Sequence, residues 1–389
     1  MIAQSNFTTS LVESAAKRFQ GLFVALVALP LAACSGASAQ QTEAPVATGA
    51  PAAQAAPAPV TSAAPSAAPA IAEPTVDFPT WLAALRADAL AQGISQPTVT
   101  AALINFSPLP RVIELDRKQP EFTITLRQYL DRTISSARVA QAKAKYAEHH
   151  TLLEAVGRKY GVQPRFIVAL WGIETNFGQN TGGFSVVQAL ATLAYDGRRS
   201  QYFRGELMNA LKIIDAGNVT AAAMRGSWAG AMGQNQFMPS SFLSYAQDYN
   251  GDGKRDIWTT PADVFASTAN YLKQSGWRDD ETWGREVKLP ANFGPQLKAL
   301  LPAEPPAGCR AQRFITARKP LSEWSKLGIR RADGGELPNR DIQASLAVPE
   351  GEQGPAMLVY EDFRTTLKWN CSISFATAVG TLADRIEAP

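Results

Sequence analysis

From residue 77 onward, apolar side chains recur mainly at the spacing of an α-helix. The first predicted helix runs from Phe78 to Gln92, because its large apolar residues return every three or four positions and Gly93 ends the pattern. The same spacing predicts further helices at Thr98–Ile104, Glu121–Glu148, Thr151–Tyr160, Arg165–Asn176, Phe184–Tyr195, Arg199–Ala216, Ser240–Tyr249 and Pro261–Ser275.

After Gly276 the pattern changes. Prolines divide the next stretch into short pieces, and two of them, Glu286–Leu289 and Ala356–Tyr360, have the composition of strands. We expect a small β-containing subdomain over residues 286–360, followed by a helix from Phe363 to Ile386. The expected fold class is therefore mainly α (α+β).

The first 33 residues have the pattern of an export signal. A basic pair, Lys17 and Arg18, precedes an apolar run that is too short to span a bilayer. The run ends in Leu31-Ala32-Ala33-Cys34, which resembles the lipobox of bacterial lipoproteins, whose Cys becomes the lipidated N-terminus. Ser35 after that Cys favours the periplasmic face of the outer membrane. The alternative is an ordinary secretory signal with a Cys at this place by chance.

Residues 34–76 are dominated by Ala and Pro and cannot bury a core, so we expect an extended tether. Enough chain remains beyond it for a large core. With Cys34 assigned to the lipid, Cys309 and Cys371 remain, and we expect them to pair in an oxidising compartment. Two unpaired thiols are the alternative.

The residue inventory excludes several kinds of chemistry. The chain has only two His, His149 and His150, so a three-His zinc site within one chain and an HExxH helix are both excluded. The two Gly-rich motifs that bind the phosphates of nucleotides, GxxxxGK[ST] and GxGxxG, are both absent from the sequence. We therefore expect no organic cofactor and no nucleic-acid partner. Carboxylates, amides and many aromatic residues remain (8 Trp, 9 Tyr and 17 Phe), and these suit carbohydrate chemistry.

One predicted helix carries an acidic residue at the border of its apolar face. Glu174 follows Leu170 by four positions, with Trp171 and Phe177 nearby and no Lys or Arg in the next turn. Desolvation should raise the pKa of this carboxyl and keep it protonated near neutral pH. A general acid for glycosidic cleavage needs that property. The alternative is a helix-end Glu whose carboxylate reaches solvent.

A second segment, residues 226–240, combines Gly and Ala with hydroxyl and amide side chains. Small residues allow a ligand to approach the backbone closely. Ser227, Gln234 and Gln236 can form hydrogen bonds with sugar hydroxyl and acetamido groups. On its residues alone, the segment could equally be a tight helix contact.

Three motifs resemble the lytic murein transglycosylase B family. They are Gly172-Ile-Glu-Thr-Asn-Phe-Gly178, Ala189-Leu-Ala-Thr-Leu-Ala-Tyr-Asp-Gly-Arg-Arg199 and the segment from Gly226 to Ser240. Val359-Tyr360 and Trp369-Asn370 match as well, and the resemblance covers residues 78–386. It implies a lysozyme-like fold that cleaves peptidoglycan between N-acetylmuramic acid and N-acetylglucosamine. We then expect a helical region at 77–156, the catalytic core at 157–285, the β-containing subdomain and a helical segment at 361–389.

The resemblance also implies roles for individual residues, with Glu174 as the single catalytic acid and base. The implied cleft residues are Ser227, Gln236 and Asn370, with Tyr195 and Tyr271 as further groove residues. The chain departs from the family after Asn370, where Cys371 and Phe375 replace a basic residue and a Tyr. Phe375 can stack on a sugar but cannot donate a hydrogen bond.

A single carboxyl implies a non-hydrolytic mechanism. Glu174 would protonate the glycosidic oxygen and then accept the proton of the muramoyl C6 hydroxyl, which closes on C1 to give a 1,6-anhydro product. Hydrolytic glycosidases use a pair of carboxylates, and Asp196 or Glu206 could supply the second one. A hydrolytic muramidase therefore stays open, as does a non-catalytic peptidoglycan-binding lipoprotein.

Residues 248–256 follow the first half of an EF-hand loop. Oxygen ligands at loop positions 1, 3, 5 and 7 would be Asp248, Asn250, Asp252 and the main-chain carbonyl of Lys254. Position 12 is Thr259 where a Glu is expected, and the family resemblance implies Asp263 as the closing carboxylate. We expect a structural Ca²⁺ site, and the alternative is a cluster of turns with solvated acids.

Overall fold

The structure is a computed structural model that describes residues 76–117, 124–304 and 308–387. The expected signal peptide, the lipidation site Cys34 and nearly all of the expected tether lie outside the described residues. All described residues belong to one structural unit, residues 67–389. Within these ranges, no helix is both long and apolar enough to cross a membrane.

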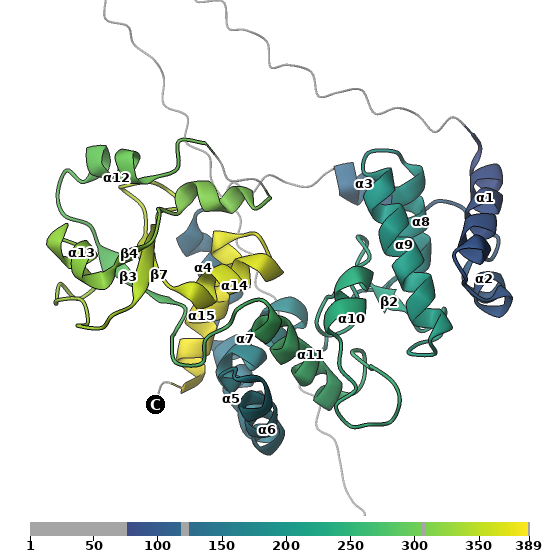
Figure 1. Ribbon diagram of the computed structural model, residues 1–389, viewed down its shortest axis with the longest axis horizontal. Helices are drawn as coiled ribbons and strands as arrows, with labels where there is room; N and C mark the ends of the chain where they lie inside the picture. The colour runs from purple at the N-terminus through teal and green to yellow at the C-terminus, as the bar shows by residue number, and fades with distance from the viewer. Residues whose placement is uncertain (1–75, 118–123, 305–307, 388–389) are drawn as a thin grey trace, which may run out of the picture. The chain divides into compact units, whose positions relative to one another are not determined.

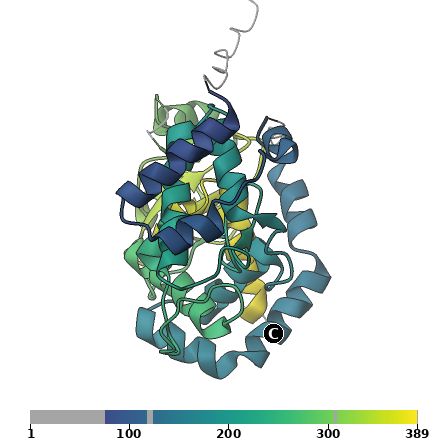
Figure 2. The same ribbon diagram turned by 90° about the vertical axis from the view of Figure 1, so that its right-hand side faces the viewer.

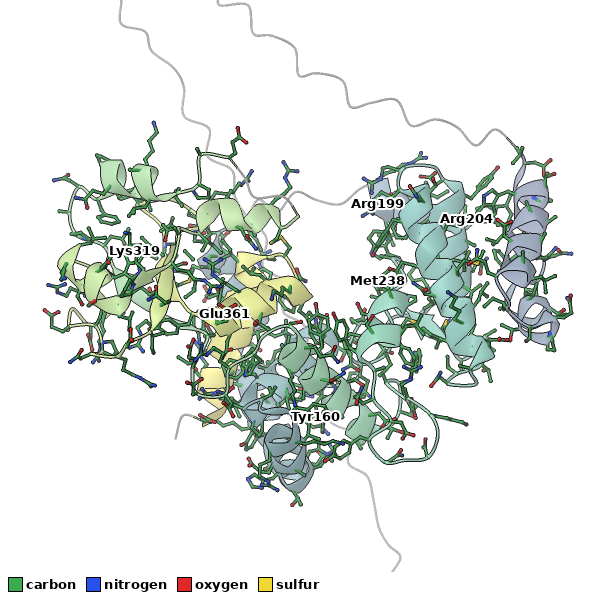
Figure 3. The ribbon with its side chains drawn as sticks, viewed as in Figure 1. Tyr160, Arg199, Arg204, Met238, Lys319 and Glu361 are labelled. Carbon is green, nitrogen blue, oxygen red and sulfur yellow. A yellow bond between two sulfur atoms is a disulfide. The ribbon has the colours of Figure 1, made fainter. Side chains whose placement is uncertain are left out.

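A first group of helices shares one hydrophobic core. It consists of α1 (Phe78–Ala91), α2 (Gln96–Ala102), α3 (Pro110–Arg117), α8 (Val186–Tyr195), α9 (Ser200–Asp215) and α10 (Pro239–Tyr245). Helix α1 begins where the Asp77 carboxylate accepts the Thr80 N–H at 2.8 Å. It lies beside α9 (Figures 1 and 2), where Arg204, labelled in Figure 3, forms an ion pair with Asp88.

A second group surrounds α7. It consists of α4 (Leu126–Thr133), α5 (Ser136–Glu148), α6 (His150–Tyr160), α7 (Pro164–Thr175), α11 (Pro261–Gln274), α14 (Glu361–Trp369) and α15 (Ile373–Glu387). Because α7 contacts α5, α6, α11 and α15, apolar residues all around it are buried, including Phe166, Val168 and Leu170. The central helix therefore holds its last turn, which carries Glu174, in a fixed position.

Two predicted helices are each divided in two. The single helix predicted over Glu121–Glu148 is wrong, because the Ser135 hydroxyl accepts the Arg138 N–H at 3.2 Å and starts a new helix, α5. The helix predicted over Phe363–Ile386 is interrupted at residues 370–372, between α14 and α15. Apolar periodicity continues across both breaks, so it could not reveal them.

The sheet occupies the region predicted to contain strands. Its strands are β3 (Gly284–Lys288), β4 (Lys319–Pro320), β5 (Arg330–Arg331), β6 (Gln343–Ala347) and β7 (Ala356–Val359). Their order is β4-β6-β7-β3-β5, with every neighbouring pair antiparallel. Two helices that the periodicity did not predict, α12 (Gly294–Leu300) and α13 (Leu321–Lys326), share a third core with the sheet, in which Phe293 and Trp324 are buried.

Each core combines segments that are far apart in the sequence. Helices α6 and α7 contact each other, so the domain boundary expected at 156/157 falls inside the second group. A short 3-10 helix, η1 (Arg310–Phe314), follows Cys309, which forms a disulfide with Cys371. This bond joins the region before β4 to the link between α14 and α15.

Candidate active site

Glu174 lies in the last turn of α7, immediately before a sharp reversal of the chain. Asn176 and Phe177 both have left-handed backbone angles, with φ of 50° and 57°. Such angles are unfavourable for residues with a Cβ, so the fold must hold this turn in place. Gly172 makes room for it, because a Cβ there would lie 2.7 Å from the Phe177 ring. The residues around Glu174 are therefore needed for the shape of this turn as well as for chemistry.

The Glu174 side chain is half-buried, and its carboxyl accepts one hydrogen bond. The Trp369 indole Nε1–H donates to Oε1 at 2.7 Å. Burial raises the pKa of Glu174 to about 7, and the hydrogen bond from Trp369 opposes that rise. A carboxyl with this pKa can both donate and accept a proton at neutral pH.

Trp369 is held against Glu174 by other aromatic side chains. Its ring centroid lies 4.7 Å from that of Tyr271 and 5.2 Å from that of Phe237. The Tyr271 hydroxyl donates to the Lys368 carbonyl at 2.8 Å, and burial raises the pKa of Tyr271 to about 12. Tyr271 thus lies beside the site, with its hydroxyl engaged by the backbone.

The segment from Gly226 to Ser240 forms a tight turn next to α7. A Cβ on Gly226 would lie 2.2 Å from the Ala231 carbonyl oxygen, so the backbone itself fills that space. The Ser227 hydroxyl accepts the Ala231 N–H at 3.0 Å and keeps its own proton for a ligand. Gln236, with φ of 50°, donates its amide to the carbonyls of Thr181 at 3.1 Å and Gly233 at 2.9 Å. Its amide oxygen has no partner in the described part of the chain.

Both ends of the Gln234 amide form hydrogen bonds within the protein. Its amide oxygen accepts the Trp171 Nε1–H at 2.7 Å, and its amide nitrogen donates to the Trp258 carbonyl at 2.8 Å. We had expected Gln234 to be able to bind sugar, and the structure instead assigns both ends of its amide to packing. Alternation of amides along the segment could not distinguish Gln234 from Gln236.

Asn370 lines a cavity of about 530 Å³ together with Phe375 and Tyr129. Burial raises the pKa of Tyr129, and the charge of Glu174 raises it further, so Tyr129 lies within electrostatic reach of the catalytic candidate. Tyr129 was not predicted as a site residue. It lies on α4, in a stretch that reads as a solvated helix, and only the packing of α4 beside α15 brings it here.

Tyr195 has its contacts elsewhere. Its hydroxyl donates to the Val76 carbonyl at 3.0 Å, and its ring packs on those of Phe78 and Trp81 at centroid distances of 5.0 and 5.7 Å. The structure therefore places Tyr195 in the contact between α1 and α8, and among the described residues no hydrogen bond or ring contact joins it to Glu174.

The two carboxylates that could have paired with Glu174 have other partners. Asp196 forms an ion pair with Arg117 at 2.7 Å. Glu206 is buried and accepts hydrogen bonds from the Ser240 backbone at 2.9 Å and from the Ser240 hydroxyl at 2.6 Å. In the described residues, no second carboxylate shifts the pKa of Glu174. The geometry thus provides one acid–base group.

Comparison with known proteins decides the family. The model of the family described as the transglycosylase SLT domain matches residues 77–384. The chain belongs to this family of lytic transglycosylases. It is 31% identical over 261 residues to membrane-bound lytic murein transglycosylase B of Escherichia coli (strain K12). The aligned region makes up 67% of this chain and 66% of that protein, which is just under two thirds of its length.

Solved structures of lytic transglycosylases have a similar fold. SltB3 from Pseudomonas aeruginosa, in complex with NAG-anhNAM-pentapeptide, is 46% identical, with 80% of both chains covered and a TM-score of 0.73. Escherichia coli Slt35, in complex with calcium, is 27% identical, covers 78% of this chain and 92% of that chain, and has a TM-score of 0.64. The predicted fold class, mainly α (α+β) and lysozyme-like, is confirmed.

The loop after α10 folds around its acidic residues. The Asp248 carboxylate accepts the N–H groups of Gly251 at 2.7 Å and Gly253 at 2.9 Å. Asp263 is buried and accepts the N–H groups of Tyr249 and Asp256, both at 2.8 Å. Burial raises the pKa of Asp263, and the nearby charge of Asp248 makes a smaller contribution to the rise.

The donor set of this loop fits a hard cation only if amide and main-chain oxygens take part. No group of three or more His, Cys, Asp or Glu residues gathers as a metal cluster within the described ranges. The predicted set includes the Asn250 amide and the Lys254 carbonyl, which are oxygen ligands typical of Ca²⁺. Asp252 accepts the Lys254 N–H at 2.9 Å, which brings these two residues together in the loop.

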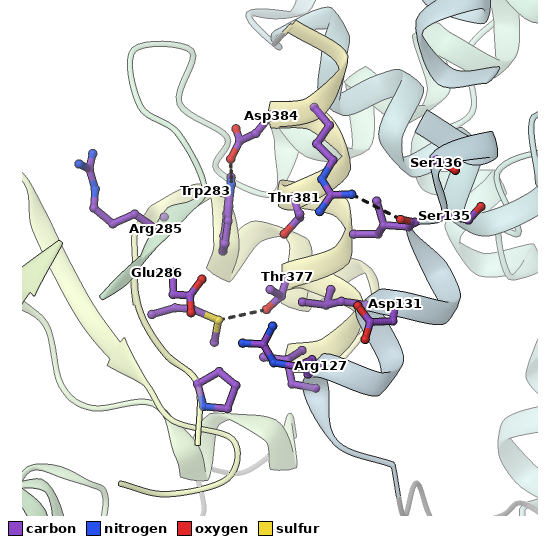
Figure 4. A pocket seen from close by; sticks show the side chains of 17 residues that line it. Arg127, Asp131, Ser135, Ser136, Trp283, Arg285, Glu286, Thr377, Thr381 and Asp384 are labelled. Atoms are coloured by element: carbon purple, nitrogen blue, oxygen red, sulfur yellow. Dashed lines mark hydrogen bonds between the residues drawn. The ribbon is translucent and has the colours of Figure 1, made fainter. Parts of the chain in front are cut away.

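A larger cavity, of about 640 Å³, lies between α4, β3 and α15 (Figure 4). Trp283 donates its Nε1–H to Asp384 there at 2.8 Å, and burial raises the pKa of Asp384. Neither Glu174 nor any other predicted site residue lines this cavity. Of the two cavities, only the smaller one is lined by a predicted cleft residue, Asn370.

Proposed function

We propose that this protein is a lytic transglycosylase that cleaves the β-1,4 bond between N-acetylmuramic acid and N-acetylglucosamine in peptidoglycan and leaves a 1,6-anhydromuramoyl end. The single observation that supports this most directly is the lone carboxyl of Glu174, with a pKa of about 7 beside Trp369. Membership of the family and the 46% identity to SltB3, whose complex holds NAG-anhNAM-pentapeptide, point to the same reaction.

The reaction follows from one group acting twice. Protonated Glu174 donates its proton to the glycosidic oxygen as the bond to C1 breaks, and the N-acetyl oxygen of the muramoyl unit stabilises the developing cation. The Glu174 carboxylate then accepts the proton of the muramoyl C6 hydroxyl, whose oxygen bonds to C1. No water is consumed, and Glu174 ends in its starting, protonated state.

Neighbouring groups position the sugars in this proposal. The Ser227 hydroxyl can donate to a sugar oxygen, and the free amide oxygen of Gln236 can accept from an acetamido N–H. Asn370, Tyr129 and Phe375 line the adjoining cavity.

A hydrolytic muramidase is less well supported, because Asp196 and Glu206 are bound to other partners. A non-catalytic role is less well supported, because it gives no use to a desolvated carboxyl with a pKa near neutrality.

Replacing Glu174 tests this function. Glu174→Gln should abolish lysis of purified sacculi, because the amide cannot donate or accept the required proton, and the melting temperature should not fall. Wild-type digests, analysed by mass spectrometry, should contain muropeptides with 1,6-anhydro ends. Glu148→Gln removes an exposed carboxylate and should leave activity intact. Reducing-end products from the wild type, or full lysis by Glu174→Gln, would contradict the proposal.

We also propose a structural Ca²⁺ ion in the loop of residues 248–263. Asp248, Asn250, Asp252, the Lys254 carbonyl and Asp263 would hold it. The nearby negative charges of Asp248 and Asp263 support the proposal, as does the calcium complex of the related Slt35. Calorimetric titration with Ca²⁺ tests it.

The location follows from the N-terminal sequence. We propose that Cys34 is lipidated and anchors the enzyme to the periplasmic face of the outer membrane, where peptidoglycan strands lie within reach of the tether. The LAAC motif and the Ser after it support this, and one relative is itself described as membrane-bound. A change in membrane fractionation on replacing Cys34 tests it.

A further inference from the structure

The cavity beside Asn370 has an unusual charge composition. Two arginines of η1, Arg310 and Arg313, line it together with Tyr129, Asn370 and Phe375, and no carboxylate is among its lining residues. We call it the η1 cavity. Its walls therefore combine two guanidinium groups, an amide and aromatic rings, a set that binds carboxylates on a partly apolar ligand.

Both arginines are free to take a ligand. Arg310 and Arg313 are exposed, and neither has an ion pair or a side-chain hydrogen bond with another described residue. The Arg313 guanidinium lies 4.5 Å from the centroid of the Phe314 ring, which supports its side chain without using its N–H donors. Their charge is thus not neutralised by the part of the protein that the structure describes.

The segment that carries these arginines is fixed at both ends. Before it, Cys309 forms the disulfide with Cys371, which itself lines the cavity. After it, the Phe314 carbonyl accepts the Val348 N–H at 3.0 Å, next to the end of β6. Without these two attachments, a five-residue 3-10 helix could not hold a defined position.

The η1 cavity adjoins the catalytic carboxyl. Tyr129 lines the cavity and lies within electrostatic reach of Glu174. Asn370, another lining residue, directly follows Trp369, which donates its indole N–H to Glu174. A group attached to the muramoyl sugar near the scissile bond is therefore close enough to reach the cavity.

We propose that the η1 cavity binds the peptide that each muramoyl unit carries, with Arg310 and Arg313 binding its carboxylates. This inference rests on the proposed function, since only a peptidoglycan strand brings such a peptide to Glu174. Bidentate guanidinium–carboxylate pairs give both affinity and orientation. The enzyme should consequently cleave strands that carry peptides better than strands without them.

The test compares two substrates with one double variant. Arg310→Gln with Arg313→Gln should lower kcat/KM about tenfold or more on peptide-bearing strands, because two charge-assisted contacts are lost. On strands whose peptides an amidase has removed, kcat/KM should match that of the wild type. The control, Arg111→Gln with Arg158→Gln, removes the same charge from exposed positions outside the cavity and should change neither value.

Two further variants sharpen the result. Arg310→Lys with Arg313→Lys should recover part of the preference for peptide-bearing strands, since the charges return without the planar fork. Cys309→Ser with Cys371→Ser should reproduce the selective loss, because η1 is then released at one end. Equal loss of cleavage on both substrates, or no loss on either, would overturn the inference.

These outcomes are distinct from failure of the proposed function. If the reaction is not transglycosylation, wild-type enzyme yields no 1,6-anhydro products from either substrate. If only the peptide inference fails, those products form from both substrates and the variants remove no difference between them.

Discussion

At the scale of single residues, the chemistry depends on the balance of two effects on Glu174. Burial raises its pKa to about 7, and the Trp369 hydrogen bond lowers it. Because this pKa lies above the unfolded value of 4.5, the folded state binds more protons between these pH values, and stability falls as pH rises through about 7. Glu174→Gln should therefore be at least as stable as the wild type above that pH.

The same balance predicts the pH profile. For wild type, kcat/KM should fall as pH rises above about 7, because the first step needs the protonated acid. Trp369→Phe removes the donor that stabilises the carboxylate, so the pKa of Glu174 should rise and the falling limb should move to higher pH. Measurement of kcat/KM across the neutral range checks this.

Trp258→Phe provides the matched control for this pH measurement. The Trp258 indole N–H donates to the Arg225 carbonyl at 3.1 Å and not to Glu174. In Trp258→Phe, the pH at which kcat/KM falls should be the same as in the wild type. A Trp369→Phe limb at lower pH than that of the wild type would contradict the assigned role of the hydrogen bond.

At the scale of elements, the turn after β2 (Arg225–Gly226) depends on close backbone contact. β1 (Phe184–Ser185) pairs antiparallel with β2, which places Phe184 opposite Gly226. The space for a Cβ on Gly226 is already taken by the Ala231 carbonyl and by Val186. These contacts fix the backbone of the turn that carries Ser227.

Gly226→Ala should therefore lower the free energy of unfolding by about 2 kcal/mol, the typical cost of overpacking a filled site. Urea denaturation measures this. Gly205→Ala, on α9, is the control, because nothing lies within 4 Å of the added Cβ and Ala favours the helix. That variant should be as stable as the wild type or more so, and equal stability of the two variants would show that the turn is not tightly packed.

The loop of residues 248–263 should gain stability from Ca²⁺. Free Ca²⁺ at about a hundred times its dissociation constant should stabilise the protein by about 2.7 kcal/mol, with a matching rise in Tm. Asp252→Asn keeps the acceptor for the Lys254 N–H but removes one charge, so it should weaken binding and reduce the rise.

Asp279→Asn, outside the loop and exposed, is the control and should behave as the wild type. Titration of wild type with millimolar Ca²⁺ that gives neither heat of binding nor a rise in Tm would remove the site.

At the scale of the whole molecule, two of the three cores must combine before the site exists. Glu174 comes from the second core, and the turn that holds Ser227 is packed on the first. The η1 cavity is also built on the second core, against which Ala311 and Phe314 pack, and the disulfide between Cys309 and Cys371 joins two sides of it across 62 positions of sequence. A change that loosens any of these contacts should affect activity before it unfolds the chain.

The proposed lipid anchor is also tested on the whole chain. Cys34→Ser should move the protein from the membrane fraction to the soluble periplasmic fraction, while the isolated enzyme keeps its activity on sacculi. Cys309→Ser with Cys371→Ser serves as control and should stay in the membrane fraction. Recovery of Cys34→Ser with the membranes would contradict lipidation at this residue.

Much of this architecture could be predicted from the chain itself, because strong local signals mark it. Periodic apolar residues predicted α1, α7, α9 and α11. The place of Glu174 on the border of an apolar face made it a candidate, and the family resemblance selected it as the catalytic residue. The break at Ser135 was missed, because a capping Ser inside a strongly helical stretch reads like any polar surface position. Gln234 was not separated from Gln236, since both are amides in one segment and only their partners differ.

The sequence by itself determined the mainly helical class, the family, Glu174 as the candidate acid and the cysteines available for pairing, because each depends on local pattern or residue type. Only the tertiary structure decided that Trp369 donates to Glu174, that Tyr129 approaches it, that Tyr195 packs on α1, and that η1 brings two arginines to the site. Those features join residues distant in the chain. They follow from the packing of cores and a disulfide, which no local periodicity encodes.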